Sequence, residues 1–267
     1  MLSICATPIG NLDDVTLRVL RELAEAEVVL CEDTRHARRL LERHRIRARL
    51  LSYHEHNEAK RVGELLPRLA AGQRMALVSD AGLPSISDPG ARLIHAALDA
   101  GVQVTVLPGP SAVDTALVSS GFAAERYQFL GFLPRGERAL SALWEELAAW
   151  PWPAIAFESP RRLPATLRSL ALAAPERQVA VCRELTKRYE EVARGRACEL
   201  ASRFEQPPKG EVTLVFGPAE TPPRSAEPRA AEAVADLVAI GVPRRRAAEV
   251  VARLTGLPRK RLYDSSL

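Results

Sequence analysis

The sequence lacks the features of disulfide-stabilised, zinc-binding and membrane proteins. It contains only four cysteines in 267 residues, and none forms the closely spaced CxxC pair that zinc sites normally need. Cys5, Cys31 and Cys182 lie in apolar, strand-like runs, so we expect reduced core residues. No apolar run is as long as a membrane span, and the first residues lack the layout of a signal peptide. These absences predict a soluble, cytoplasmic protein with no membrane contact.

The composition is that of a globular protein. Apolar residues make up 47 % of the chain and charged residues 26 %. The length allows one large domain or two modest ones. The net charge of +4 comes with 37 Lys and Arg residues, and arginine suits anionic partners such as phosphate. A GC-rich genome explains the arginines equally well, so charge alone does not identify a partner.

The first part of the chain alternates short apolar runs with helical periods. Strands are expected at Ser3–Ile9, Glu27–Glu32, Arg49–Tyr53, Arg74–Ser79 and Gln103–Leu107. Helices are expected after Asp14 as the N-cap and at Arg35–Arg45, Glu58–Ala71 and Ala91–Ala100, the last closed by Gly101. This alternation predicts an α/β domain with a mostly parallel sheet.

The pattern restarts after Ser111–Ser120. Strands are expected at Tyr127–Leu133, Pro153–Glu158, Gln178–Glu184, Tyr189–Arg194 and Glu211–Phe216. Helices are expected at Glu137–Trp150 and Arg161–Ala173, and the tryptophans of this region are expected to pack in the core. Strands follow one another closely here, which predicts antiparallel pairs in a second α/β domain. The cleft between the two domains is the natural ligand site.

A linker and a helical tail are expected to follow. Pro218–Pro228 is rich in proline and small residues. Beyond it, Gly241-Val242-Pro243 and Gly256-Leu257-Pro258 divide the chain into about three short helices. The predicted domains are therefore 1–112, 113–219 and 220–267. The tail is rich in arginine, which fits either phosphate contact or a solvated helix face.

The unusual residues of the first domain gather at the carboxyl ends of its predicted strands, where open α/β sheets bind ligands. The longest of these loops is Ser79–Gly90, and loops of twelve residues in a compact domain are usually functional. It contains no Lys or Arg and no GxxxxGK[ST] pattern, and the turn after the first strand has no GxGxxG motif. We therefore expect neither a nucleoside triphosphate nor a dinucleotide. Asp80 and Asp88 favour a positively charged ligand.

Several distinctive motifs follow one another along the chain. They are Ala6-Thr7-Pro8-Ile9-Gly10-Asn11, Glu32-Asp33-Thr34-Arg35, His54-Glu55-His56-Asn57-Glu58, Ser87-Asp88-Pro89-Gly90, Leu107-Pro108-Gly109-Pro110-Ser111, Glu158-Ser159-Pro160, Arg183-Glu184-Leu185-Thr186-Lys187 and Lys209-Gly210-Glu211. In this order they resemble the motifs of the ribosomal small subunit RNA methyltransferase I family, in the tetrapyrrole-methylase superfamily. The resemblance runs from Ile4 to about Phe216. This chain departs from the family pattern at Leu83, where threonine is usual, and at Arg161, where histidine is usual.

The resemblance implies two α/β domains with S-adenosylmethionine in the cleft between them, a small helical tail, and a homodimer. It implies methylation of the 2′-hydroxyl of a cytidine, expected to be cytidine 1402, in 16S RNA of the 30S subunit. By this similarity, the cofactor contacts are Pro8, Gly10, Asp80, Ala81, Gly82, Ile86, Ser87 and Ser111. Candidates facing the RNA are Asp33, Arg35, His54, Glu55, Asn57, Glu158 and Arg161.

The base that would take the ribose proton is not fixed by the sequence. Lys187 and Glu190 are the catalytic candidates, with positioning alone as the alternative. His54 and His56 are spaced i, i+2 and not as HExxH, so no metal is expected. Two other functions stay open. One is a methylase of the same fold acting on a corrin, a porphyrin or a protein side chain, and the other is a non-catalytic ribosome-assembly factor.

Overall fold

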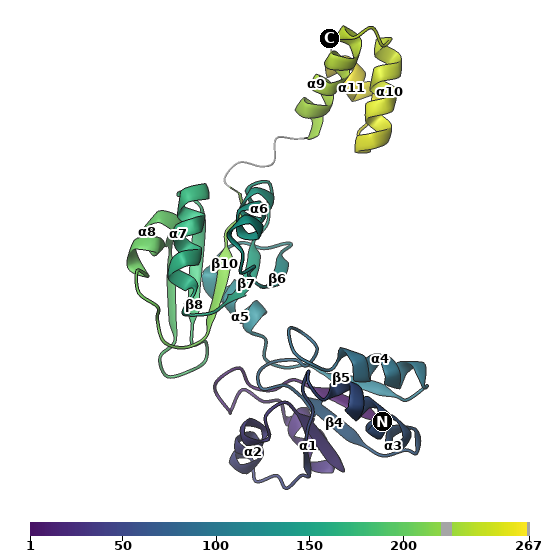
Figure 1. Ribbon diagram of the computed structural model, residues 1–267, viewed down its shortest axis with the longest axis vertical. Coiled ribbons are helices and arrows are strands. Elements are labelled where there is room, and N and C mark those ends of the chain that lie inside the picture. Colours follow the sequence, from purple (N-terminus) through teal and green to yellow (C-terminus); the bar gives the residue numbers. More distant parts are fainter. Residues whose placement is uncertain (220–225, 266–267) are drawn as a thin grey trace.

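A computed structural model describes residues 1–219 and 226–265. Figure 1 shows two α/β units, each built on its own sheet, and a group of helices beyond the second unit. The first unit contains β1 (Leu2–Cys5), α1 (Leu17–Glu25), β2 (Val28–Cys31), α2 (Thr34–Arg43), β3 (Leu50–Ser52), α3 (Glu58–Ala70), β4 (Met75–Val78), α4 (Ala91–Asp99) and β5 (Val104–Leu107). The fold class predicted from the sequence is confirmed.

The first sheet is parallel and has the strand order β3-β2-β4-β1-β5. The three inner strands, β2, β4 and β1, are buried on both faces, because their side chains alternate between the two faces and helices cover both. In β4, Met75 and Leu77 pack toward α3 and α4, whereas Ala76 and Val78 pack toward α1 and α2. Short apolar strands with helices on both sides therefore hold all five carboxyl ends at one edge.

Two details of this unit differ from the sequence expectations. The first strand ends at Cys5 and not at Ile9, because Thr7 leaves the sheet to pair with Gly82. Asp14 is not the N-cap of α1. Thr16 is, and its hydroxyl accepts a hydrogen bond from the Val19 amide at 3.1 Å. Both residue types suit an N-cap, and the backbone conformation selects the second.

The second unit has a mixed sheet in the order β6-β7-β10-β8-β9. Its elements are α5 (Ala112–Ser120), β6 (Gln128–Phe132), α6 (Glu137–Ala148), β7 (Ala154–Glu158), α7 (Leu163–Ala173), β8 (Gln178–Arg183), β9 (Glu191–Arg196), α8 (Ala197–Arg203) and β10 (Val212–Phe216). The predicted antiparallel pairs are present around β10 and between β8 and β9, but β6 pairs with β7 in parallel. Helix α8 was not expected from the sequence.

Helices cover both faces of the second sheet. α6, α7 and α8 pack on one face, where Trp144 stacks edge-on against Phe216 and donates to the Ser169 hydroxyl at 2.9 Å. The expected packing role of Trp144 is confirmed. α5 covers the other face, and Ile9 of the first unit packs into the same apolar cluster. Cys5, Cys31 and Cys182 are at most 1 % exposed, as expected.

The tail contains α9 (Ala226–Ala239), α10 (Arg244–Thr255) and α11 (Arg259–Ser265), which pack around Val234, Ala248 and Leu262. The two predicted breaks at Gly241 and Gly256 are confirmed, and both glycines have positive φ. The linker expected at Pro218–Pro228 falls mostly outside the described residues, and α9 already begins at Ala226. The boundaries 1–112, 113–219 and 220–267 stay a prediction. No helix within 1–219 or 226–265 is long and apolar enough to cross a membrane.

A buried hydrogen bond fixes the start of α7 to β7. The Glu158 side chain is fully buried, and its carboxylate accepts from the Thr166 hydroxyl at 2.6 Å and from the Ser159 amide at 2.7 Å. Thr166→Val keeps the shape and removes the donor, so we expect a loss of about 1–3 kcal/mol in the free energy of unfolding. Urea denaturation measures it.

Ser202→Ala is the matched control, because the Ser202 hydroxyl is exposed and bonds only its own helix at the Cys198 carbonyl. We expect the control to change stability by less than about 0.5 kcal/mol. Equal stability of the Thr166→Val variant and the wild type would show that the Glu158 carboxylate does not depend on this donor.

Candidate active site

A cleft of about 600 Å³ lies between the two units. The first sheet contributes the loops after β1, β2, β4 and β5, and the second contributes Phe132, Phe157 and the start of β10. Its volume lies within the range of roughly 300–1,000 Å³ typical of small-molecule sites. Of the eight predicted cofactor contacts, Asp80, Ala81, Gly82, Ile86, Ser87 and Ser111 line this cleft. Pro8 and Gly10 line a smaller neighbouring pocket of about 370 Å³.

The loops after β1 and β4 are joined by a two-residue bridge. The Thr7 amide donates to the Gly82 carbonyl at 2.8 Å, and the Gly82 amide donates back to the Thr7 carbonyl at 3.1 Å. The Thr7 hydroxyl also donates to the Ser79 carbonyl at 3.0 Å. Gly82 has φ +77°, a backbone conformation that would be strained for a residue with a side chain. The bridge therefore sets the floor of the cleft before any ligand binds.

The rest of the Ser79–Gly90 loop has an unusual backbone. Ser85 and Ser87 have φ of +73° and +62°. Each such non-glycine conformation costs on the order of 1–3 kcal/mol and persists only where the surroundings enforce it. Strain of this kind gathers at functional sites, and Ser87 is one of the predicted cofactor contacts. The Leu83 side chain, where the family usually has threonine, packs partly buried against the first core.

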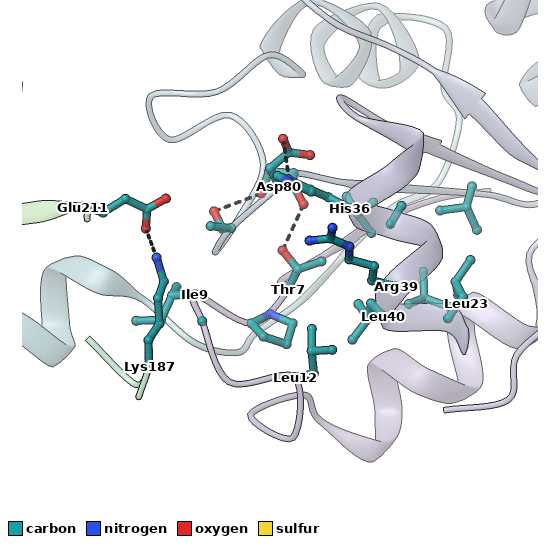
Figure 2. A pocket seen from close by; sticks show the side chains of 18 residues that line it. Thr7, Ile9, Leu12, Leu23, His36, Arg39, Leu40, Asp80, Lys187 and Glu211 are labelled. Atoms are coloured by element: carbon teal, nitrogen blue, oxygen red, sulfur yellow. Dashed lines mark hydrogen bonds and ion pairs between the residues drawn. The ribbon is translucent and has the colours of Figure 1, made fainter. Parts of the chain in front are cut away.

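Asp80 connects the loop after β4 to the first turn of α2 (Figure 2). Its carboxylate accepts from the Asp33 amide at 3.2 Å and lies 3.2 Å from the Nδ1 atom of His36. His36 lines the smaller pocket together with Arg39 and Leu40 of the same helix. The sequence did not single out His36, although its position in the first turn after Glu32-Asp33-Thr34-Arg35 was the available signal.

Lys187 lies where the two units meet. Its ammonium donates to the Glu184 carboxylate at 2.9 Å and to Glu211 at 2.8 Å, the second contact being drawn in Figure 2. Burial alone would lower the pKa of Lys187, but the hydrogen bonds with Glu211 and Glu184 raise it. Lys187 is therefore held as an ammonium, which has no lone pair to accept a proton. Glu211 lines both cavities and was not predicted as a site residue.

Glu190, the other catalytic candidate, caps a turn. Its carboxylate accepts from the Thr186 amide at 2.6 Å, and the residue is exposed. It does not line either cavity. The structure thus brings Lys187 to the edge of the smaller pocket and leaves Glu190 outside it.

Two carboxylates in the cleft have raised pKa values. Burial, followed by the charges of Glu32 and Asp80, raises the pKa of Asp88 to about 6. Burial and the charges of Asp80 and Glu55 raise the pKa of Glu32. Both residues line the cleft. A cavity with clustered carboxylates and raised pKa values attracts cations and marks a functional-site candidate.

The candidates for RNA contact at the ends of β2 and β3 bond mainly to one another. Asp33 caps α2 and holds the exposed Arg35 guanidinium at 2.6 Å, and hydrogen bonds from Arg35 keep the pKa of Asp33 well below its usual range. The Asn57 side-chain oxygen accepts from the His54 amide at 2.9 Å, and its nitrogen lies 3.1 Å from His54 Nε2. Glu55 is exposed beside His56.

The two candidates after β7 have opposite environments. Glu158 lies at the cleft wall, but its carboxylate is fully buried and bonded within its own chain. Arg161 is exposed, with no ion pair among the residues described. The cleft residues Phe132 and Phe157, in edge-to-face contact at 5.5 Å, were not predicted as site residues, because apolar strand residues carry no functional signal in a sequence. Among residues 1–219 and 226–265, no group of three or more His, Cys, Asp and Glu can hold a metal ion.

A family model described as Tetrapyrrole (Corrin/Porphyrin) Methylases matches residues 1–201 of this chain. Solved structures agree on the fold. The methyltransferase CobJ aligns with a TM-score of 0.61 at 19 % identity over 82 % of this chain and 94 % of its own. Diphthine synthase aligns with a TM-score of 0.59 at 14 % identity over 81 % and 89 %. The chain belongs to the tetrapyrrole methylase family.

Relatives with a known name indicate the group within this family to which the chain belongs. A Thermotoga maritima protein named ribosomal RNA small subunit methyltransferase I is 46 % identical over 172 residues, which is 63 % of this chain and 76 % of that protein. The Mesorhizobium japonicum protein of the same name is 48 % identical over 64 % of this chain, and the match spans only 58 % of its own length. Within the methylases, the chain is thus a member of the ribosomal RNA small subunit methyltransferase I group.

Gly10 of the first unit packs tightly against the loop Leu185-Thr186-Lys187 of the second unit. A Cβ at this position would lie 2.5 Å from the Lys187 Cγ atom and 2.9 Å from the Leu185 carbonyl oxygen. Gly10→Ala must therefore push the two units apart, with a strain of about 1–3 kcal/mol. We expect weaker binding of S-adenosylmethionine, by roughly tenfold for each 1.4 kcal/mol, measured by calorimetry.

Gly63→Ala is the control, because nothing lies within 4 Å of a Cβ at Gly63 inside α3. This change should leave cofactor binding unaltered and stabilise the helix by roughly 0.5–1 kcal/mol. Wild-type affinity in the Gly10→Ala variant would contradict the view that this contact sets the width of the cleft.

Proposed function

We propose that the protein transfers a methyl group from S-adenosylmethionine to the ribose 2′-hydroxyl of a cytidine, cytidine 1402, in 16S ribosomal RNA. The observation that carries this proposal is the identity of 42–48 % to proteins named ribosomal RNA small subunit methyltransferase I, in a chain whose matching loops line one cleft. The 30S subunit as substrate, a homodimer and a cytoplasmic location belong to the same proposal.

The residues of the cleft fit the cofactor. Gly82 carries no side chain where it lines the cleft, and the carboxylates of Asp80 and Asp88 suit a cation. Ile86, Phe132 and the strained Ser87 form a partly apolar wall. When bound, S-adenosylmethionine supplies an activated methyl group on a positively charged sulfur.

Methyl transfer depends mainly on how the reacting atoms are aligned, because the methyl group of the donor is already activated. The ribose oxygen must come within roughly 3–3.5 Å of the methyl carbon, in line with the carbon–sulfur bond. The proposed RNA contacts follow the ends of strands that border the cleft. They are Arg35 in the first turn of α2, Asn57 at the N-cap of α3 and Arg161 after β7, together with Asp33, His54, Glu55 and Glu158. Because the cleft itself is acidic, its charges repel phosphates. We therefore propose that phosphates bind outside it, at exposed arginines, while one ribose enters.

The corrin or porphyrin methylase stays as a second candidate on the basis of the family model. Substrates of that kind carry several carboxylates. The negative charges of Glu32, Asp80 and Asp88 in the cleft would repel them. A non-catalytic assembly factor requires no cofactor affinity. Calorimetry with S-adenosylmethionine separates that alternative from both enzymes.

The central test is to incubate the protein with labelled S-adenosylmethionine and either 30S particles or naked 16S RNA, and then to map the labelled nucleotide. We expect one label, on the 2′-oxygen of cytidine 1402. RNA labelled on a base, or at another nucleotide, would overturn the proposed reaction. Absence of label with RNA and its presence with a tetrapyrrole would favour the second candidate.

The tail offers a second place for phosphate contact. On α10 and α11, Arg245, Arg259 and Lys260 are exposed and have no ion pair among the described residues, whereas Arg246 and Arg253 both pair with Glu249. We propose that the unpaired cations contact RNA. Replacing these three with glutamine should then lower the slope of log affinity against log salt by about 0.7–0.9 for each phosphate that is no longer neutralised.

Replacing Arg18, Arg21 and Arg168, which are exposed on α1 and α7, removes the same charge elsewhere and serves as the control. Filter binding of 16S RNA over a salt series measures both variants. Equal slopes for the tail variant and the wild type would leave the tail without a role in RNA binding.

A further inference from the structure

Asp88 and its neighbour Glu32 differ from the other acidic residues around the cleft because neither has a hydrogen-bond or ion-pair partner among the described residues. Asp80 is bonded to the first turn of α2, Asp33 to Arg35, and Glu158 to Thr166. Asp88 lines the cleft half-buried and makes no hydrogen bond or ion pair with any residue in the described part of the chain. A half-buried carboxylate without a partner is costly, so its retention in a ligand cleft points to a role in function.

The backbone on both sides of Asp88 is fixed. The positive φ values of Ser85 and Ser87 lie just before it. Pro89 follows, and the Gly90 amide donates to the Glu58 carboxylate at 3.3 Å. The backbone of Asp88 is therefore held at a set place in the cleft wall, from which its side chain can reach a bound substrate.

The charged groups around Asp88 come from several neighbouring elements. Glu32 follows β2 and Asp80 follows β4, and both make the Asp88 carboxylate more basic. Glu58 on α3 is within 4.0 Å of the Arg92 guanidinium on α4 and accepts from Tyr53. After β3, the charge of Glu55 raises the pKa of Glu32 and that of His54 lowers it. With a pKa of about 6, Asp88 is mostly ionised at neutral pH and still binds a proton better than an ordinary aspartate.

We propose that Asp88 is the general base of methyl transfer and accepts the proton of the ribose 2′-hydroxyl. This inference rests on the proposed function. The ribose oxygen forms a bond to the methyl carbon, and the carbon–sulfur bond breaks with its electron pair left on sulfur. The hydroxyl proton moves to the Asp88 carboxylate and is lost to water when the products leave. Charge balances, since the sulfonium becomes a neutral thioether and one proton is released.

The alternatives in the cleft are less suited to this step. Lys187 is held as an ammonium between Glu184 and Glu211. Glu190 caps the Thr186 amide outside both cavities. Glu32 shares the cleft and has a raised pKa. We assign Glu32 a positioning role, in which its negative charge increases the basicity of Asp88.

The test measures single-turnover methyl transfer to 16S RNA with saturating S-adenosylmethionine. Asp88→Asn keeps the shape and removes the base, so we expect the rate to fall roughly 10²–10⁴-fold. Binding of S-adenosylmethionine, measured by calorimetry, should weaken by less than about tenfold, which corresponds to 1.4 kcal/mol. Asp99→Asn, at the exposed far end of α4, is the matched control and should react at the wild-type rate.

A pH series between about 5 and 8 adds a readout that a structural role would not move. The wild-type rate should fall toward low pH as Asp88 gains its proton. Glu32→Gln removes a negative charge beside Asp88. Without that charge the ionised form of Asp88 is favoured, so the low-pH limb of the Glu32→Gln variant should shift to lower pH. The Asp88→Asn variant should lose this limb altogether.

Three outcomes would overturn the inference. They are an Asp88→Asn rate within about threefold of wild type, an unchanged low-pH limb in that variant, and a large loss only in a Lys187→Ala, Glu190→Ala double variant. Each can occur while the wild type still methylates cytidine 1402, so the proposed function would survive. If the wild type labels no RNA, the proposed function itself fails, independently of Asp88.

Discussion

The paired hydrogen bonds between Thr7 and Gly82 are the constraint on which the site depends. They end β1 as a sheet strand and tie its loop to the loop after β4, two segments that are far apart in the chain. The loop after β1 then carries Ile9 into the apolar cluster beneath α5 and Gly10 against Leu185-Thr186-Lys187. This backbone bridge thus connects the loop after β4, which lines the cleft, to the loop after β1, which contacts the second unit through Ile9 and Gly10.

The charges around the cleft are divided by function. Carboxylates gather inside, where Glu32, Asp80 and Asp88 favour a cation. Exposed cations such as Arg161 lie on the surrounding loops and on the tail. Under the proposed function, this division lets a positively charged donor and a polyanion bind together, because each would contact a surface of opposite charge.

Much of the fold could be predicted from the sequence, because short apolar strands and capped helices carry local signals. The strand ends were less predictable. Cys5 ends β1 only because Thr7 finds a partner at Gly82, and no local pattern shows a partner so distant. The N-cap of α1 is Thr16 and not the predicted Asp14, because both residue types suit that position and only the backbone conformation decides between them.

The site shows the same limit. The resemblance of the motifs to a known family predicted Asp80, Gly82 and Ser87 as cofactor contacts, and the loop after β4 places all three on the wall of the cleft. The pairing of Lys187 with Glu211 could not be predicted, since β9 and α8 lie between them in the chain. Electrostatic environment depends on such three-dimensional neighbours, so a sequence motif can indicate a residue and leave its protonation state undetermined.

The strand order of the second sheet has a consequence for how the chain folds. β10 is the central strand, between β7 and β8, and it is also the last strand in sequence. The first sheet is complete at Leu107, whereas the second has no centre until Phe216 has been synthesised. During translation the first unit can therefore fold early. The second unit waits with one edge of β7 and one edge of β8 unpaired until β10 is made, and the cleft, which β10 helps to line, is completed only then.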